Sequence, residues 1–188
     1  LHSVRKGNGE ILFSMVKMDA VSPEGNPLLP VALLRGHFVS ILICLIDQET
    51  KERYFLLVKQ RRVANGAWFY EHPAGMMDSD SDPYAVALTE VQEETGLTIQ
   101  REALNLLNEQ PLFSSPGLLD ECGYFFFVEL EMSNKEIMSY HEQAKGEGGE
   151  GEYITTYVAA AGDARTLIRN TSGLLAIFLY EERRVNQP

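Results

Sequence analysis

Residues 75–97 read GMMDSDSDPYAVALTEVQEETGL, a stretch that sets a glycine before a segment rich in glutamate. Asp82 is a good N-cap residue and Pro83 suits the first helical position, so the stretch predicts a helix over 83–95. Gly96 supplies the left-handed residue that ends such a helix. The chain is therefore expected to turn at Gly75 and then to enter a helix of defined length.

Three glutamates fall within that helix. At about 100° per residue, Glu90 and Glu94 lie together on one face as an i, i+4 pair, and Glu93 lies to one side of them. Two carboxylates one turn apart repel each other by roughly a few tenths of a kcal/mol, so their pairing suggests a cation between them. Oxygen ligands of this kind suit Mg²⁺ or Mn²⁺. The alternative is a solvated helix face, which is the commoner origin of a glutamate cluster.

The stretch resembles the Nudix box, whose pattern is Gly, five residues, Glu, seven residues, then Arg-Glu-apolar-any-Glu-Glu-any-Gly-apolar. The residues in register with that pattern are Gly75, Glu90, Val91, Glu93, Glu94, Gly96 and Leu97. Two positions depart from it, because Ser81 stands in place of the first Glu and Thr89 in place of the Arg. In the family those two residues mainly brace the loop and helix through ion pairs, so the resemblance implies that the metal ligands are kept.

Flanking motifs narrow the resemblance to the Nudix branch that cleaves ADP-ribose and nucleotide sugars. They are Gln60 with Arg62, the entry Glu71, Pro73, Ala74 and Gly75, the Ser-Pro-Gly loop 115–121, and the acidic segment 150–154. The resemblance runs from about Arg35 to the C-terminal helix. It implies an α/β fold, the Nudix-type α/β/α sandwich with a mixed β-sheet. It is closest to the ADP-sugar and UDP-sugar diphosphatases, whose substrates are small nucleotide diphosphates.

The same resemblance implies roles for particular residues. Glu90, Glu94 and the backbone carbonyl of Ala74 would hold Mg²⁺, with Mn²⁺ as the alternative ion. The residues expected at the substrate are Arg62, Arg61, Glu121 and Gly117, with Arg61 equally readable as a solubilising residue at a strand edge. The general base is expected to be Glu150, with Glu93 and Glu152 as alternatives. Glu150 lies between two glycines and can swing towards a substrate.

Composition fits one acidic enzyme domain. The chain has 188 residues, 45% of them hydrophobic, and a formal net charge of −11. A protein of this charge repels polyanions, so neither nucleic acid nor an anionic membrane is an expected partner. No apolar run reaches the roughly 18 residues that span a membrane. A small diphosphate is repelled as well, which makes bridging cations and a few local arginines necessary.

The two cysteines, Cys44 and Cys122, suggest reduced core residues and a cytoplasmic location. Because the chain begins at Leu1, a removed organelle-targeting peptide stays open as an alternative. Residues 1–34 are interpreted as an N-terminal strand region that is a candidate for exchange in a homodimer, and residues 35–188 as the Nudix hydrolase domain.

Hydrophobic patterning predicts the remaining elements. Strands are expected at 11–18, 37–46, 53–60, 123–131 and 153–158, with a polar turn at 47–52. Helices are expected at 83–95, 161–169 and 173–184. Strands that alternate with a few helices imply a mixed sheet between helical layers. Besides the diphosphatase, two classes remain open: a Nudix-fold module that binds a nucleotide without cleaving it, and an acidic interaction protein.

Overall fold

A computed structural model of the chain describes residues 1–77, 81–145 and 153–186. The strands of this described part form a three-stranded sheet, in the order β1-β2-β3, and a nine-stranded sheet with the main path β11-β12-β5-β4-β10-β8. The strands are β1 (His2–Arg5), β2 (Ile11–Lys17), β3 (Val31–Leu34), β4 (Phe38–Asp47), β5 (Arg53–Arg61), β6 (Trp68–Glu71), β7 (Ala74–Met76), β8 (Asn105–Leu106), β9 (Leu112–Phe113), β10 (Cys122–Met132), β11 (Ala144–Lys145) and β12 (Ile154–Ala160). The helices are α1 (Pro83–Thr95), α2 (Asn134–Ser139), α3 (Ala161–Leu167) and α4 (Thr171–Asn186), with a 3₁₀ turn η1 (Arg101–Ala103).

Strand β4 is the centre of the large sheet. It pairs parallel with β10, where Ile41 lies opposite Phe126, and antiparallel with β5, where Ile43 lies opposite Leu56. The short strand β7 also pairs antiparallel with β4, and β6 pairs with β5. The mixed sheet expected from the sequence is therefore confirmed.

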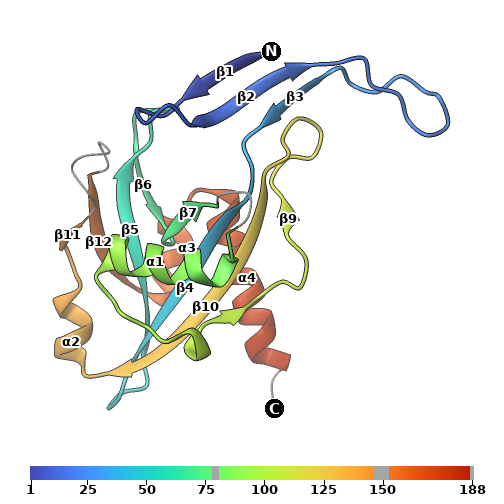
Figure 1. Cartoon of the computed structure of the whole chain (residues 1–188). Coiled ribbons are helices and arrows are strands. Elements are labelled where there is room, and N and C mark those ends of the chain that lie inside the picture. Colours follow the sequence, from blue (N-terminus) through green and yellow to red (C-terminus); the bar gives the residue numbers. More distant parts are fainter. Residues whose placement is uncertain (78–80, 146–152, 187–188) are drawn as a thin grey trace.

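The two faces of β4 carry two hydrophobic cores, because successive side chains of a strand point to opposite sides. Ile41 and Ile43 belong to a core that includes Val91 of α1. Leu42 belongs to a second core, which includes Ile177 of α4 and residues of α3. In Figure 1, α1 lies in front of the sheet, and α3 and α4 lie behind it. This arrangement confirms the α/β/α sandwich.

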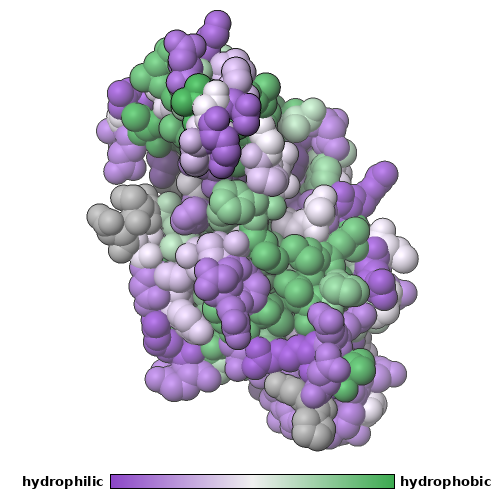
Figure 2. All heavy atoms as spheres, turned by 90° about the vertical axis from the view of Figure 1, so that its right-hand side faces the viewer, coloured by the Kyte–Doolittle hydropathy of each residue, from purple (hydrophilic) through white to green (hydrophobic). Residues whose placement is uncertain are grey.

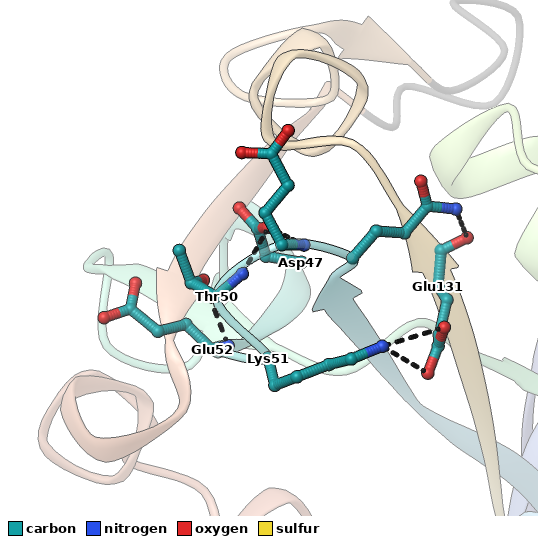
Figure 3. A network of polar contacts seen from close by, with 7 residues as sticks. Asp47, Thr50, Lys51, Glu52 and Glu131 are labelled. Carbon is teal, nitrogen blue, oxygen red and sulfur yellow. Dashed lines mark hydrogen bonds and ion pairs between the residues drawn. The ribbon is translucent and has the colours of Figure 1, made fainter.

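The turn between β4 and β5 is held by its own polar side chains (Figure 3). Asp47 accepts hydrogen bonds from the backbone amides of Glu49 at 2.8 Å and Thr50 at 3.1 Å. Lys51 has a φ of 58°, and its ammonium group lies 3.2 Å from a carboxylate oxygen of Glu131 on β10. The predicted turn at 47–52 is thus confirmed, and it also ties the hairpin to the neighbouring parallel strand.

The three-stranded sheet lies above one end of the large sheet (Figure 1). The small sheet is joined to the large one through the loop that precedes β10, because the Leu33 amide donates a hydrogen bond to the Leu118 carbonyl at 2.8 Å. Two apolar side chains on one face of β2 remain half exposed, Ile11 at 54% and Met15 at 51%. The N-terminal region thus presents apolar surface that no described part of the chain covers, and Figure 2 shows hydrophobic residues among hydrophilic ones on the upper part of the molecule.

The predicted elements 11–18, 37–46, 53–60, 123–131 and 153–158 correspond to β2, β4, β5, β10 and β12 within a few residues at each end. The predicted helix 83–95 matches α1, whereas 161–169 ends earlier, at Leu167, and 173–184 begins earlier, at Thr171. No sequence signal identified α2, η1 or the short strands β1, β3, β6 to β9 and β11. No helix in residues 1–77, 81–145 and 153–186 has the length and apolar character needed to cross a membrane.

Candidate active site

Helix α1 begins and ends as its sequence predicts. The side chain of Asp82 accepts a hydrogen bond from the Tyr84 amide at 3.1 Å, with Pro83 at the first helical position. Gly96 has a φ of 77°, and its amide donates to the carbonyl of Gln92 at 2.8 Å. Local capping therefore fixes both ends of the helix, and with them the positions of its glutamates along the helix axis.

Gly75 lies directly against the side chain of Glu90. A Cβ atom on Gly75 would stand 1.8 Å from Oε1 of Glu90 and 2.1 Å from its Cδ. No larger residue fits there unless the carboxylate moves. The glycine of the motif is therefore required by a close approach between strand β7 and helix α1.

Glu94 is held on the same strand. It is 6% exposed, and its Oε2 accepts a hydrogen bond from the Ala74 amide at 3.0 Å. Glu90 and Glu94 thus both meet the short segment 74–75, and a metal centre there stays a prediction. Their position in the second half of α1 is electrostatically unfavourable, because a helix carries partial negative charge at its C-terminal end.

This donor set fits a hard divalent cation. It offers two carboxylates on one rigid helix and a neighbouring backbone segment, and Mg²⁺ is usually bound by one or two carboxylates together with waters and phosphate oxygens. Among the residues that the structure describes, no group of three His, Cys, Asp or Glu side chains forms a fuller cage. The site is thus suited to an ion that also binds a phosphate.

Two basic residues support α1 from outside the motif. Arg101 of η1 forms an ion pair with Asp82 and stacks on Tyr84 at 4.4 Å from the ring centroid. This bond lowers the pKa of Asp82. At the other end, Nζ of Lys145 lies 2.6 Å from the position of a Cβ on Gly96, where a cation offsets the helix dipole. Sequence reasoning missed both residues, because no local spacing links Arg101 to Asp82, 19 positions away, or Lys145 to Gly96.

Arg62 and Arg61 have different surroundings. Nε of Arg62 donates to Oε2 of Glu71 at 2.7 Å, and 46% of its side chain is exposed. Arg61 instead donates to the Gly66 carbonyl at 2.8 Å and stacks on Trp68 at 4.5 Å from the ring centroid. Arg61 therefore braces the β5–β6 hairpin, and a role for it at the substrate stays a prediction.

Glu121 and Gly117 lie in the loop before β10. Glu121 is 8% exposed and forms an ion pair with Arg35. The neighbouring Asp120 accepts hydrogen bonds from the amides of Arg35 at 2.7 Å and Gly36 at 3.2 Å. Gly117 is exposed, with open space where a Cβ would stand. These contacts join the loop to the entry of β4; a role for Glu121 or Gly117 at the substrate stays a prediction.

Of the three candidate bases, the structure describes Glu93 alone. Glu93 is exposed on α1, beside the Glu90 and Glu94 pair. Glu150 and Glu152 lie outside the described residues. The choice among them therefore stays a prediction.

His72 was not identified from the sequence. Its imidazole is buried, with no hydrogen bond from either ring nitrogen to any described residue, and it packs edge-on against Phe55. Burial lowers its pKa to about 4. The ring is thus neutral at pH 7, behind the segment that meets the glutamates.

The comparisons with known proteins agree with this geometry. The NUDIX domain model matches residues 36–152. The chain is 28% identical over 178 residues to Nudix hydrolase 14, chloroplastic, of Arabidopsis thaliana, which covers 90% of this chain and 57% of that protein. It is 31% identical over 121 residues to the ADP-ribose pyrophosphatase of Bacillus subtilis (strain 168), which covers 64% of this chain and 59% of that protein. The chain thus spans less than two thirds of the length of both relatives.

Among solved structures, an ADP compounds hydrolase has a TM-score of 0.67 over 99% of this chain and 92% of its own, at 17% identity. That likeness shows a shared fold. The family match covers more than half of the chain, including the glycine turn, α1 and the paired glutamates. The protein therefore belongs to the NUDIX domain family.

Proposed function

We propose that the chain is a hydrolase that needs a divalent metal, Mg²⁺ or alternatively Mn²⁺, and cleaves the diphosphate of an ADP-sugar or UDP-sugar. The observation that carries the proposal is the contact of Glu90 and Glu94 with residues 74–75. Together with the Ala74 carbonyl, these carboxylates would hold the ion. When bound, a divalent ion there supplies charge neutralisation and polarisation of a phosphoryl group.

The chain's own residues divide the remaining work. Arg62 binds the diphosphate, since a guanidinium matches phosphate oxygens with paired hydrogen bonds. Glu150 accepts a proton from the attacking water as its oxygen bonds to phosphorus. The bond from that phosphorus to the bridging oxygen breaks, and the products are a nucleoside monophosphate and a sugar phosphate. Glu93 and Glu152 are the alternative bases.

ADP-ribose is the second candidate substrate. It is favoured by the name of the Bacillus subtilis relative, an ADP-ribose pyrophosphatase. ADP-ribose shares the diphosphate and the adenosine of an ADP-sugar, so the same metal centre and Arg62 would serve it. A module that binds nucleotides without cleaving them is the third candidate, favoured by Ser81 and Thr89 in place of the family's Glu and Arg.

A coupled phosphate-release assay tests the proposal. ADP-ribose, ADP-glucose and UDP-glucose are incubated with the protein and Mg²⁺ or Mn²⁺, and alkaline phosphatase then releases phosphate from the products but not from intact substrates. We expect turnover of at least one substrate, and none when the protein is freed of divalent ions and neither Mg²⁺ nor Mn²⁺ is added before the phosphatase step. Calorimetry with the same nucleotides would identify a binding module, if binding occurs without phosphate release. Absence of both would leave an acidic interaction protein.

We further propose that residues 1–34 exchange within a homodimer and that residues 35–188 form the hydrolase domain. The half-exposed Ile11 and Met15 on β2 support this assembly, because exposed apolar sheet surface commonly marks an interface. Two free, buried cysteines, Cys44 and Cys122, support a reducing compartment such as the cytoplasm. Polyanionic nucleic acids and anionic membranes are not proposed as partners, given the charge of −11.

A further inference from the structure

Glu71 ends strand β6 and is only 7% exposed, although it carries a charge. Each of its two carboxylate oxygens has a separate partner from a different part of the chain. Oε2 accepts the hydrogen bond from Nε of Arg62 at 2.7 Å, and Oε1 accepts one from Nδ2 of Asn170 at 2.8 Å. The carboxylate thus connects the end of β5 to the start of α4.

The Asn170 side of this connection is rigid. Its Oδ1 accepts a hydrogen bond from the Gly173 amide at 3.1 Å and so caps the first turn of α4. A Cβ on Gly173 would lie 2.4 Å from that oxygen and 2.7 Å from Cγ2 of Ile168, so the turn closes tightly. With its oxygen engaged, Asn170 can present only its amide nitrogen to Glu71.

The Arg62 side is open. In the part of the chain that the structure describes, the guanidinium bonds only to Glu71, and it does so through Nε. The two terminal nitrogens, with four N–H donors, remain available to an anion. An arginine held in one orientation loses less conformational freedom when it binds a phosphate than an arginine that is free to rotate.

Glu71 is also close to the metal site along the chain. Only His72 and Pro73 separate it from Ala74, which is about 10 Å for extended backbone. The Pro73 carbonyl accepts a hydrogen bond from the Ile41 amide at 2.9 Å, so this segment is fixed on β4. The backbone path from Glu71, which holds Arg62, to the segment that meets the paired glutamates is therefore both short and fixed.

We propose that Glu71 is a positioning residue that orients the Arg62 guanidinium towards the substrate diphosphate and is itself held by Asn170. This inference rests on the proposed function, since it assigns the origin of the orientation of Arg62. Both carboxylate oxygens of Glu71 are engaged by Arg62 and Asn170, so the proposal gives it no contact with the substrate or the metal. Its role is exerted through Arg62, and this gives it a distinct experimental signature.

The test is a double-mutant cycle with Arg62→Ala and Glu71→Gln, measured as kcat and KM with the best substrate of the panel. A glutamine offers one oxygen and one NH₂ group, so a donor must face either Arg62 or Asn170 and one of the two bonds is lost. We expect Arg62→Ala to lower kcat/KM by about 100-fold, mainly through KM. Glu71→Gln should lower it by about 10-fold, and the double variant should be no worse than Arg62→Ala alone within about 3-fold.

Rescue by added guanidinium supplies a second readout. At millimolar concentration, guanidinium should restore activity to Arg62→Ala, because the Glu71 carboxylate can still bind it. It should fail to restore activity to the double variant. Glu181→Gln is the matched control, because it removes the exposed ion pair with Arg165 on α3 and should leave kcat, KM and rescue unchanged. Circular dichroism of each variant verifies folding. If Glu71→Gln does not fold, Asn170→Ala replaces it in the cycle. We then expect Asn170→Ala to lower kcat/KM by about 3-fold and to have no further effect when combined with Arg62→Ala.

Each contrary outcome has a different meaning. A wild-type chain that cleaves no substrate of the panel overturns the proposed function and this inference with it. A silent Arg62→Ala overturns the diphosphate clamp. If Arg62→Ala is impaired while Glu71→Gln is silent, or if the two effects multiply in the double variant, the positioning role alone is wrong.

Discussion

The carboxylate of Glu94 accepts a hydrogen bond from the backbone amide of Ala74, which joins the last turn of α1 to strand β7 at 3.0 Å. Glu94→Gln keeps an oxygen that can accept this bond and removes one negative charge. We therefore expect kcat to fall by about 10³-fold or more while the fold survives, because the charge is needed for metal and not for packing. Steady-state kinetics at saturating Mg²⁺ and thermal unfolding together check this. Near-normal turnover would refute the metal assignment.

Gly75→Ala should inactivate the protein through a steric clash with Glu90. The new methyl group would occupy the space of the Glu90 carboxylate, so the side chain must leave the site. We expect at least about a 100-fold loss of kcat and weaker Mn²⁺ binding by calorimetry. Gly162→Ala, where a Cβ meets open space, is the control and should have wild-type values. Equal Mn²⁺ affinities in all three proteins would contradict the close approach.

Glu150→Gln tests the base. A carboxylate that acts only as the water attacks lowers kcat and leaves KM nearly unchanged when it is removed, so we expect a loss of about 10²-fold in kcat. Glu93→Gln and Glu152→Gln are measured beside it. If either of these is inactive while Glu150→Gln is nearly silent, the base is that residue instead.

Stability should decline at high pH through Cys44. Burial raises the pKa of this thiol to about 11, whereas an unfolded cysteine titrates near 9. The folded pKa is the higher one, so the contribution is complete below pH 9 and is lost as the pH rises towards 11. Between pH 8 and pH 10 this amounts to about 1 kcal/mol. Urea unfolding at both pH values should therefore show a smaller pH-dependent loss in Cys44→Ser than in the wild type. Equal slopes would count against the shift.

The proposed homodimer is tested at β2. Met15→Glu places a charge on the half-exposed apolar face of that strand. We expect light scattering at micromolar concentration to give a dimer for the wild type and a monomer for the variant. Met138→Glu, the same substitution at an exposed methionine of α2, is the control for added charge. A fully active wild-type monomer would exclude exchange of residues 1–34.

The parts of the fold that local signals encode could be predicted. The bounds of α1 follow from Asp82, Pro83 and Gly96, whose effects act within a few residues. The long strands follow from continuous apolar runs. Strands β6 and β7 escaped prediction because each is short and exists through pairing with β5 and β4.

The candidate site likewise contains local features that the sequence could predict and long-range contacts that it could not. The spacing of Glu90 and Glu94 is a property of one helix, so the sequence predicted that they lie together. The bond between Glu71 and Asn170 joins residues 99 positions apart, and neither has a periodic partner that would reveal it. The ion pair of Arg35 with Glu121, 86 positions apart, was missed for the same reason.

The parallel pairing of β4 with β10 has a consequence for how the chain folds. The two strands are separated by more than 70 residues, including all of α1, so their pairing closes a long loop and gives the molecule a high contact order. The β4–β5 hairpin needs only the turn at 47–52 and can form first. Because α1 packs against both β4 and Phe126 of β10, the glutamates reach their final support only after this slow closure. Metal affinity should therefore be acquired late in refolding, after most helical signal has returned.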